Sequence, residues 1–214
     1  MSATFRLDRA QGALFDVGGR RFDPVQRGWL FAPTTKPPGT ELETLDIVAA
    51  LTWLQRESGY PMRVPVGVIG PREATAAQLA AALKVGELLG DCRLTVLCGG
   101  RQGVMQAVCE GVARVGGLSI GLLPEADASE ANRFVGVAIA TGIGEARNAL
   151  IARASFCLIA IGNSLGTLSE VALGRQFGKL VVGLEGAANV EGVQHVTGPK
   201  EAAERVAETI LGTG

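Results

Sequence analysis

The sequence predicts an α/β fold: a mostly parallel sheet, doubly wound so that helices cover both of its faces. From residue 64 onward, short apolar runs alternate with longer segments of helical periodicity. Glycine-bearing turns join strands to helices at residues 70–73, 99–103, 141–144 and 162–166. Strand–turn–helix units repeated in this way form parallel sheets through right-handed crossovers. The four turns should therefore lie at the carboxyl ends of the strands, the edge at which such sheets bind ligands.

The individual elements follow from this pattern. Strands are expected at residues 64–69, 93–98, 118–123, 135–140, 156–161 and 180–184. Thr75 should cap a helix whose apolar stripe consists of Leu79, Leu83 and Leu88. Further helices are expected from 104 to about 115, over 145–154, from about 167, and over 199–211.

The first 60 residues are expected to form an extension of this domain, made of edge hairpins and one helix. Weak alternation at 4–8 and 12–16 predicts the hairpins, and the TELE sequence at 40–43 reads as a capping box that opens a helix to about residue 57. Because this stretch offers few apolar positions for a core of its own, we divide the chain into an extension at 1–60 and a ligand-binding domain at 61–214. The apolar segment Trp29-Leu30-Phe31 should cover the main sheet or a second subunit.

Composition excludes several classes of function. The 20 basic residues nearly balance the 21 acidic ones, which argues against nucleic-acid or membrane partners. No apolar run approaches the roughly 18 residues of a membrane span, and the four cysteines lack the C-x-x-C spacing of zinc or redox sites. With the single histidine His195, a multi-histidine metal site is excluded, so no metal is expected. These features predict a cytoplasmic protein.

The turns at 99–103 and 162–166, each followed by a predicted helix, indicate an anion site. A glycine-bearing turn before a helix lets phosphate approach backbone N–H groups at the positive end of the helix. The turn at 99–103 has this form, although it serves equally well as a tight turn that needs glycine for geometry alone. No turn completes a G-x-G-x-x-G dinucleotide fingerprint. Arg72 and Arg101 place cations on turns at the same edge, either to bind phosphate or to face water.

Arg147 and Glu170 are the candidate chemical pair. Arg147 falls in the first turn of a helix, where the helix dipole disfavours a cation by about 0.3–1 kcal/mol, so we expect an anion nearby. Glu170 closes a second capping box, Thr167 to Glu170, and either satisfies its own helix start or faces Arg147. In the second case the pair would combine a substrate clamp with acid–base chemistry.

Three segments, taken together, resemble the motifs of a known superfamily. They are CGGRQGVM at 98–105, EARN at 145–148 and GNSLGTLSE at 162–170. Their order and spacing are similar to those of the lysine decarboxylase-like, Rossmann-like proteins, which include the Lonely Guy phosphoribohydrolases and the molybdenum cofactor carrier proteins. The resemblance covers about residues 64–184. It implies a Rossmann-like sheet, a small phosphorylated ligand and a homodimer or higher homo-oligomer.

The resemblance also implies roles for individual residues. Arg147 and Glu170 would be the catalytic pair of a phosphoribohydrolase. Gly99, Gly100, Gly103, Gly166 and Thr167 would hold the phosphate. Further candidates to bind the ligand lie on the same turns and motifs: Gly70, Arg72, Arg101, Met105, Asn148, Gly162, Asn163 and Ser164. No cofactor is required, and a nucleoside monophosphate or a molybdopterin-type molecule would be the bound ligand. Pyridoxal-dependent decarboxylation is not expected, because the motifs supply no lysine for it.

Departures from the phosphoribohydrolase pattern separate the hypotheses. The Pro-Gly-Gly of its last motif is Gly162-Asn163-Ser164 here, its first glycine is Cys98, and its lysine is Asn148. The run at 141–148 is closer to the carrier branch. Our first hypothesis is therefore a binding protein for a nucleotide- or pterin-like phosphorylated ligand. The alternatives are a nucleoside 5′-monophosphate phosphoribohydrolase and an oligomeric assembly module.

Overall fold

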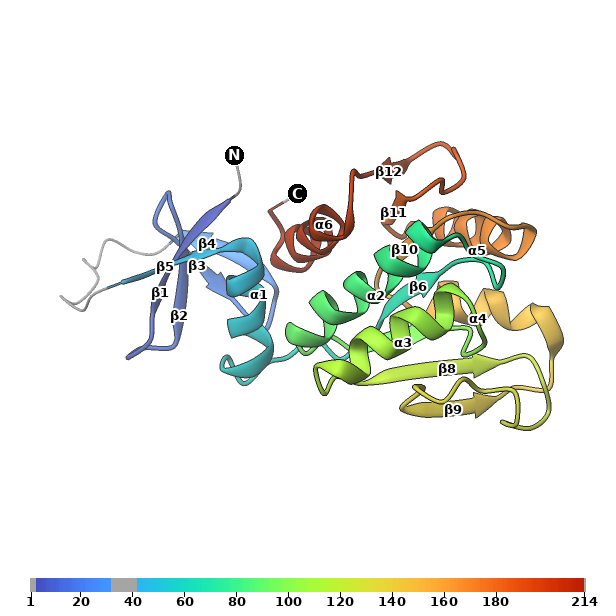
Figure 1. Ribbon diagram of the computed structural model, residues 1–214. Helices are drawn as coiled ribbons and strands as arrows, with labels where there is room; N and C mark the ends of the chain where they lie inside the picture. Colours follow the sequence, from blue (N-terminus) through green and yellow to red (C-terminus); the bar gives the residue numbers. More distant parts are fainter. Residues whose placement is uncertain (1–2, 32–41, 214) are drawn as a thin grey trace. The chain divides into compact units, whose positions relative to one another are not determined.

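A computed structural model describes residues 3–31 and 42–213 of the chain. The chain divides into two compact units, residues 1–62 together with 204–214, and residues 63–203. The larger unit carries the elements expected of the ligand-binding domain (Figure 1). The sequence placed the boundary at 60/61, two residues before this division, but it assigned residues 204–214 to the second domain.

The larger unit is built on a parallel sheet of seven strands in the order β12-β11-β10-β6-β7-β8-β9. The α/β fold predicted from the sequence is confirmed. Strand β12 was not expected, because three residues at the edge of a sheet leave no apolar run in the sequence. The strands are β6 (Val66–Ile69), β7 (Val96–Cys98), β8 (Ser119–Leu123), β9 (Val137–Ala140), β10 (Leu158–Ile161), β11 (Val181–Leu184) and β12 (Val193–His195).

Helices flank this sheet (Figure 1). Alternate residues of the strands, among them Leu97, Leu158 and Ala160, share one buried cluster with Ile151 and Val171. The period of two assigns these residues to one face of the sheet. None of the helices in the described part of the chain is long and apolar enough to cross a bilayer. The helices of the larger unit are α2 (Ala76–Asp91), α3 (Val104–Arg114), the 3-10 turn η1 (Gly144–Ala146), α4 (Arg147–Ala154) and α5 (Leu165–Gln176). Helix α6 (Pro199–Leu211) begins in this unit, but most of its residues belong to the smaller unit.

Helix α2 buries a different face from the one predicted. Ala82, Val85 and Leu89 are fully covered, whereas Leu79 of the expected stripe is 37% exposed. The reason is the close approach of α2 to α3. A Cβ added at Gly86 would overlap the carbonyl oxygen of Val108, and no other residue type fits there without moving the backbone. Glycine therefore forms the closest part of this contact, and Leu79 remains partly exposed.

The smaller unit contains an antiparallel sheet of five strands in the order β4-β3-β2-β1-β5. It buries Phe5, Leu7, Leu14 and Phe22, more apolar side chains than the sequence was expected to supply. The density of apolar residues is low, but the strand alternation directs most of them to one face. The elements are β1 (Thr4–Asp8), β2 (Ala13–Asp16), β3 (Arg20–Asp23), β4 (Gly28–Phe31), β5 (Glu43–Asp46) and α1 (Ile47–Arg56).

One expectation for this unit, the start of its helix, needs correction. The capping box at 40–43 falls partly outside the described residues, and its last member Glu43 lies in β5. The helix begins at Ile47 instead, because the carboxylate of Asp46 accepts a hydrogen bond from Ala49 N at 2.8 Å. Trp29 stacks on Phe5 within its own unit, with ring centroids 5.6 Å apart, and its indole N–H donates to Leu211 O at 2.7 Å.

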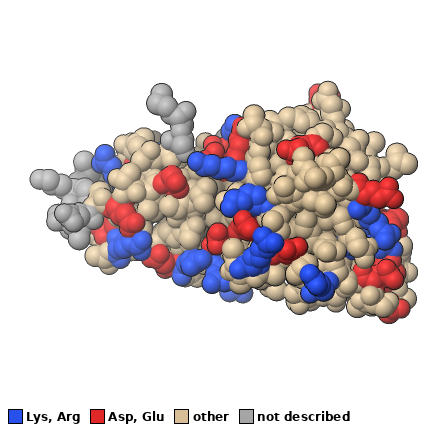
Figure 2. Space-filling model, viewed as in Figure 1, with Lys and Arg blue, Asp and Glu red and all other residues tan. Residues whose placement is uncertain are grey.

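Charges of both signs are interspersed over the face seen in Figure 2. Lys and Arg side chains form no continuous patch on that face, and acidic side chains separate them. The described surface seen there is therefore consistent with the balanced composition of the chain.

Candidate functional site

A pocket of about 450 Å³ lies at the carboxyl ends of β6 and β7 and beside the beginning of α5. Its volume falls in the range of about 300–1,000 Å³ that small-molecule sites occupy. The lining is mixed, with backbone at glycines, three arginines and two glutamates. The lining residues are Ile69, Gly70, Arg72, Gly99, Arg101, Met105, Glu145, Arg147, Asn148, Ser164, Leu165, Gly166, Thr167, Ser169 and Glu170.

Arg147 is the first residue of α4, and its guanidinium is buried at the pocket. The residue is only 4% exposed. Its Nη1 lies 3.7 Å from Glu170 Oε1 and its Nη2 lies 3.9 Å from Glu145 Oε2, both longer than a good hydrogen bond. Its Nε is buried and has no hydrogen-bond partner among the described residues. The guanidinium is therefore surrounded by carboxylates without being satisfied by them.

Gly99, at the end of β7, makes room for this guanidinium. A Cβ added there would lie 2.5 Å from Arg147 Nη1 and 2.6 Å from Met105 Sδ. The glycine is thus required by the Arg147 side chain and not by backbone torsion, since its φ is not in the left-handed region.

Glu170 lies one turn into α5 and faces Arg147. The predicted capping box at Thr167 is wrong: Ser164 is the N-cap, with its Oγ accepting from Thr167 N at 3.1 Å. Glu170 is therefore not needed at the helix start and is free to reach the pocket, where it is 6% exposed. Burial raises the pKa of Glu170 to about 8, Arg147 opposes this shift, and the negative charge of Glu145 adds to it. At neutral pH the carboxyl group is mostly protonated.

The beginning of α5 offers donors to an anion. Ser164 Oγ satisfies Thr167 N, but the amides of Leu165 and Gly166 in the first turn have no acceptor within the helix. They lie at the positive end of the helix dipole. Asn148 joins α4 to this turn, because its Nδ2 donates to Ser169 Oγ at 3.0 Å. The two helix starts are thus held together at one end of the pocket.

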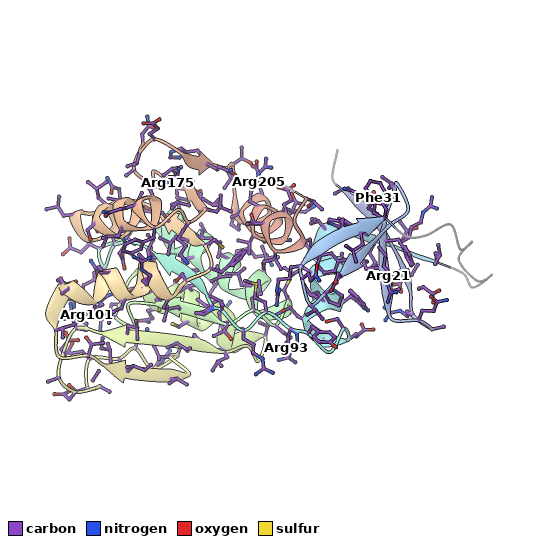
Figure 3. The ribbon with its side chains drawn as sticks, turned by 180° about the vertical axis from the view of Figure 1, so that it is seen from behind. Arg21, Phe31, Arg93, Arg101, Arg175 and Arg205 are labelled. Carbon is purple, nitrogen blue, oxygen red and sulfur yellow. The ribbon has the colours of Figure 1, made fainter. Side chains whose placement is uncertain are left out.

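The other arginines of the pocket differ in their partners. Arg101, labelled in Figure 3 near the start of α4, forms ion pairs with Glu125 and with Glu145, the latter at 3.5 Å. Arg72 is exposed and donates to Gln102 Oε1 at 3.0 Å. Arg101 is therefore fixed in place, whereas Arg72 lies at the solvent side of the pocket.

The structure brings most of the predicted site residues together. Eleven of them line the pocket: Gly70, Arg72, Gly99, Arg101, Met105, Arg147, Asn148, Ser164, Gly166, Thr167 and Glu170. Gly100, Gly103, Gly162 and Asn163 are not among the lining residues. The three glycines have φ of 74°, 71° and 69°, in the left-handed region that favours glycine, and Asn163 is exposed. Backbone geometry explains those glycines without a ligand.

Sequence reasoning missed several residues of the site. Glu145 and Ser169 line the pocket but were not proposed to bind anything, although both lie inside the quoted motifs. Asn132 was not among the predicted site residues either. Its Nδ2 donates to Gly100 O at 2.9 Å and to Arg101 O at 3.0 Å, so it fixes the turn at 99–103 from outside the pocket. The sequence around Asn132 does not predict this contact, because its partners lie about thirty residues away.

Metal ligands do not gather in the described parts of the chain, since no three His, Cys, Asp or Glu side chains lie close enough together to hold an ion.

Similar proteins share this part of the chain. An uncharacterised protein of Archaeoglobus fulgidus is 36% identical over 137 residues, which cover 64% of this chain and 90% of the relative. The molybdenum cofactor binding protein of Rippkaea orientalis is 34% identical with a TM-score of 0.67, over 70% of this chain and 99% of that one. The molybdenum cofactor carrier protein of Chlamydomonas reinhardtii is 31% identical with a TM-score of 0.64, over 70% and 99%.

The resemblance inferred from the three motifs is therefore confirmed, and the structural neighbours support a role in binding a small ligand. The SLOG cluster4 family matches residues 63–210, a stretch that contains every lining residue of the pocket. The chain belongs to the SLOG cluster4 family.

Proposed function

We propose that the protein binds a phosphorylated nucleotide- or pterin-like molecule in this pocket, in the manner of a carrier. The observation that carries the proposal is the state of Arg147, whose buried guanidinium has an unpartnered Nε and no carboxylate closer than 3.7 Å. A buried charge that lacks hydrogen bonds is costly. A phosphate group would supply short charge-assisted bonds to Arg147 and to the first amides of α5.

The chemistry of the neighbours supports the same ligand class. Two of the similar structures are named for binding or carrying the molybdenum cofactor, a molecule of the pterin class. The pocket here combines a cationic end at Arg101 and Arg147 with apolar side chains at Ile69, Met105 and Leu165. Such a division suits a ligand with one phosphorylated end and one flat, partly apolar end.

Calorimetry tests the proposal. Adenosine and guanosine monophosphates, ribose 5-phosphate and a molybdopterin-type pterin phosphate are titrated into the wild type, into Arg147→Ala and into Arg21→Ala. At least one ligand should bind the wild type, and Arg147→Ala should weaken that binding at least tenfold. Arg21 lies on β3, in the smaller unit, so its substitution should leave binding unchanged. If none of these molecules binds the wild type, the proposal is wrong.

A phosphoribohydrolase is the second candidate, and Glu170 favours it. A carboxyl group that is protonated at neutral pH beside a pocket arginine suits general acid catalysis. In this scheme Arg147 holds the phosphate of a nucleoside monophosphate while Glu170 donates its proton to the departing base. The hydroxyl of a water molecule bonds to C1′ as the N-glycosidic bond breaks, and the remaining proton of that water returns to the Glu170 carboxylate, so the products are the free base and ribose 5-phosphate.

Release of ribose 5-phosphate from a panel of nucleoside monophosphates tests this scheme. Glu170→Gln keeps the shape of the side chain but removes the transferable proton, so turnover should fall at least 100-fold with ligand affinity largely kept. No release by the wild type, or equal release by the variant, would exclude the enzyme and leave the binding proposal standing.

We also propose that the chain assembles into a homo-oligomer. Phe31 is 88% exposed on the edge strand β4, and Leu79 and Leu83 line a second pocket between α2 and α3. Exposed apolar surface marks an interaction site where it is contiguous, and a second copy of the chain would cover it. Light scattering should give at least twice the 22.1 kDa mass of the chain. A monomer at high concentration would contradict this part of the proposal.

A further inference from the structure

Glu145 lies on the turn η1 at the mouth of the pocket, and nothing in the proposed function uses it. The backbone around it is anchored, because Gly142 N donates to Glu125 O at 2.8 Å and Gly144 N donates to Pro124 O at 3.0 Å. Its side chain is 66% exposed. The carboxylate can therefore change position by rotation of side-chain torsions alone, without any movement of the turn.

The carboxylate of Glu145 spans the two arginines at the cationic end of the pocket. One oxygen, Oε1, lies 3.5 Å from Arg101 Nη1, and the other, Oε2, lies 3.9 Å from Arg147 Nη2. Both distances exceed those of a good hydrogen bond, so neither contact is tight. Arg101 has Glu125 as a closer partner, and the Nε of Arg147 is unpartnered. The Glu145 carboxylate thus lies where an anion would bridge both guanidinium groups, and its contacts with them are weak.

A phosphate group and the Glu145 carboxylate would compete for Arg101 and Arg147, and the phosphate should bind them more strongly. The Glu145 side chain is 66% exposed, so water and salt screen its contacts with the two less exposed arginines and weaken them. A phosphate carries more charge than one carboxylate and accepts several hydrogen bonds at once, so it should displace Glu145. The displaced carboxylate remains negative and nearby, and Glu170 already responds to its charge. Its residual repulsion should grow with the charge of the bound anion.

We propose that Glu145 is an internal competitor for the phosphate group of the ligand: its carboxylate lies over Arg101 and Arg147 in the free protein, and ligand binding displaces it. This inference rests on the proposed function and deepens it, since it assigns the phosphorylated end of the ligand to these two arginines. Glu145 thereby limits the affinity for anions, which favours release of the bound molecule.

Inorganic phosphate and pyrophosphate are the probes, measured by calorimetry at low salt. Glu145→Gln should bind both more tightly than the wild type, by about fivefold, with the larger gain for pyrophosphate. Glu145→Asp, which keeps the charge on a shorter side chain, should give a smaller gain. Glu130→Gln makes the same change of charge at an exposed residue of the same unit outside the pocket lining, and it should bind as the wild type does. Adenosine, which carries no phosphate, should show no gain.

The outcomes separate this inference from the proposed function. If phosphate and pyrophosphate bind Glu145→Gln no more tightly than the wild type, the inference is overturned even where a nucleotide or pterin phosphate binds. An equal gain for Glu130→Gln would overturn it too, because the effect would then be one of net charge. A gain confined to Glu145 in a protein that binds no nucleotide or pterin phosphate would support the inference and exclude the proposed ligand class. If neither protein binds any anion, both are wrong.

Discussion

The carboxyl group of Glu170 couples the pocket to the stability of the fold. Its pKa rises from the ordinary value of 4.5 to about 8 on folding, so the folded state binds this proton more tightly than the unfolded state. The tighter binding of this proton stabilises the folded state fully below pH 4.5, and this contribution to the unfolding free energy is lost as the pH rises toward 8. Between pH 5 and 9 the wild type should lose up to about 4 kcal/mol of unfolding free energy relative to Glu170→Gln. Urea denaturation at a series of pH values measures this difference.

Glu130→Gln is the control for that titration, since it removes a carboxyl group at an exposed position. Its unfolding free energy should follow the wild-type curve. Parallel curves for the wild type and Glu170→Gln would show that Glu170 does not titrate between these limits.

Gly99→Ala should separate ligand binding from stability. The added Cβ would meet Arg147 Nη1 and Met105 Sδ, which are the ends of flexible side chains, so the fold should lose only about 1 kcal/mol. The guanidinium would be displaced, and ligand affinity should fall at least tenfold. Gly28→Ala, where an added Cβ meets nothing within 4 Å, is the matched control and should alter neither property. Unchanged affinity in Gly99→Ala would contradict the placement of Arg147.

Among the secondary-structure elements, the contact between α2 and α3 depends on glycine at the crossing. A Cβ at Gly111 would overlap the carbonyl oxygen of Leu83, which is backbone and cannot rotate away. Gly111→Ala should therefore cost about 1–3 kcal/mol of unfolding free energy, as overpacking does. Gly28→Ala serves again as the control in thermal or urea denaturation. A cost near zero for Gly111→Ala would mean that the helices lie further apart than described here.

The elements that the sequence predicted best are the buried strands and the last helix. Strands such as β10 are covered on both faces, and this gives continuous apolar runs that identify them directly. The expected limits of α6, 199–211, agree with the structure. The start of α5 was misplaced because Ser164 and Thr167 are both good caps, three residues apart, and only packing selects between them.

The sequence predicted the site residues that lie within short motifs. Motifs supplied Arg147, Glu170 and Gly99, all of which line the pocket. Sequence alone could not tell a glycine that makes room for a neighbouring side chain, as Gly99 does for Arg147, from one whose backbone has a positive φ, such as Gly100. It also missed Glu145, because its partner Arg101 lies 44 residues away and the pairing exists only after folding.

Considered as a whole molecule, the chain combines a family domain with a second unit. The match to the SLOG cluster4 family spans residues 63–210, and the similar carrier structures are covered over 99% of their length by about 70% of this chain. The five-stranded sheet of the smaller unit lies before the matched stretch. The pocket therefore belongs to the part shared with those proteins, and any role of the smaller unit is additional to ligand binding.

The central claim is that Arg147 and the first turn of α5 together bind the phosphate of a small ligand. The most direct test is a crystal structure of the protein in complex with a nucleotide or pterin phosphate that calorimetry has shown to bind. We expect a phosphate within hydrogen-bond distance of Arg147 and of the Gly166 amide, with the Glu145 carboxylate turned away from Arg101 and Arg147. A ligand bound elsewhere on the molecule, with Arg147 and Glu145 unmoved, would contradict it.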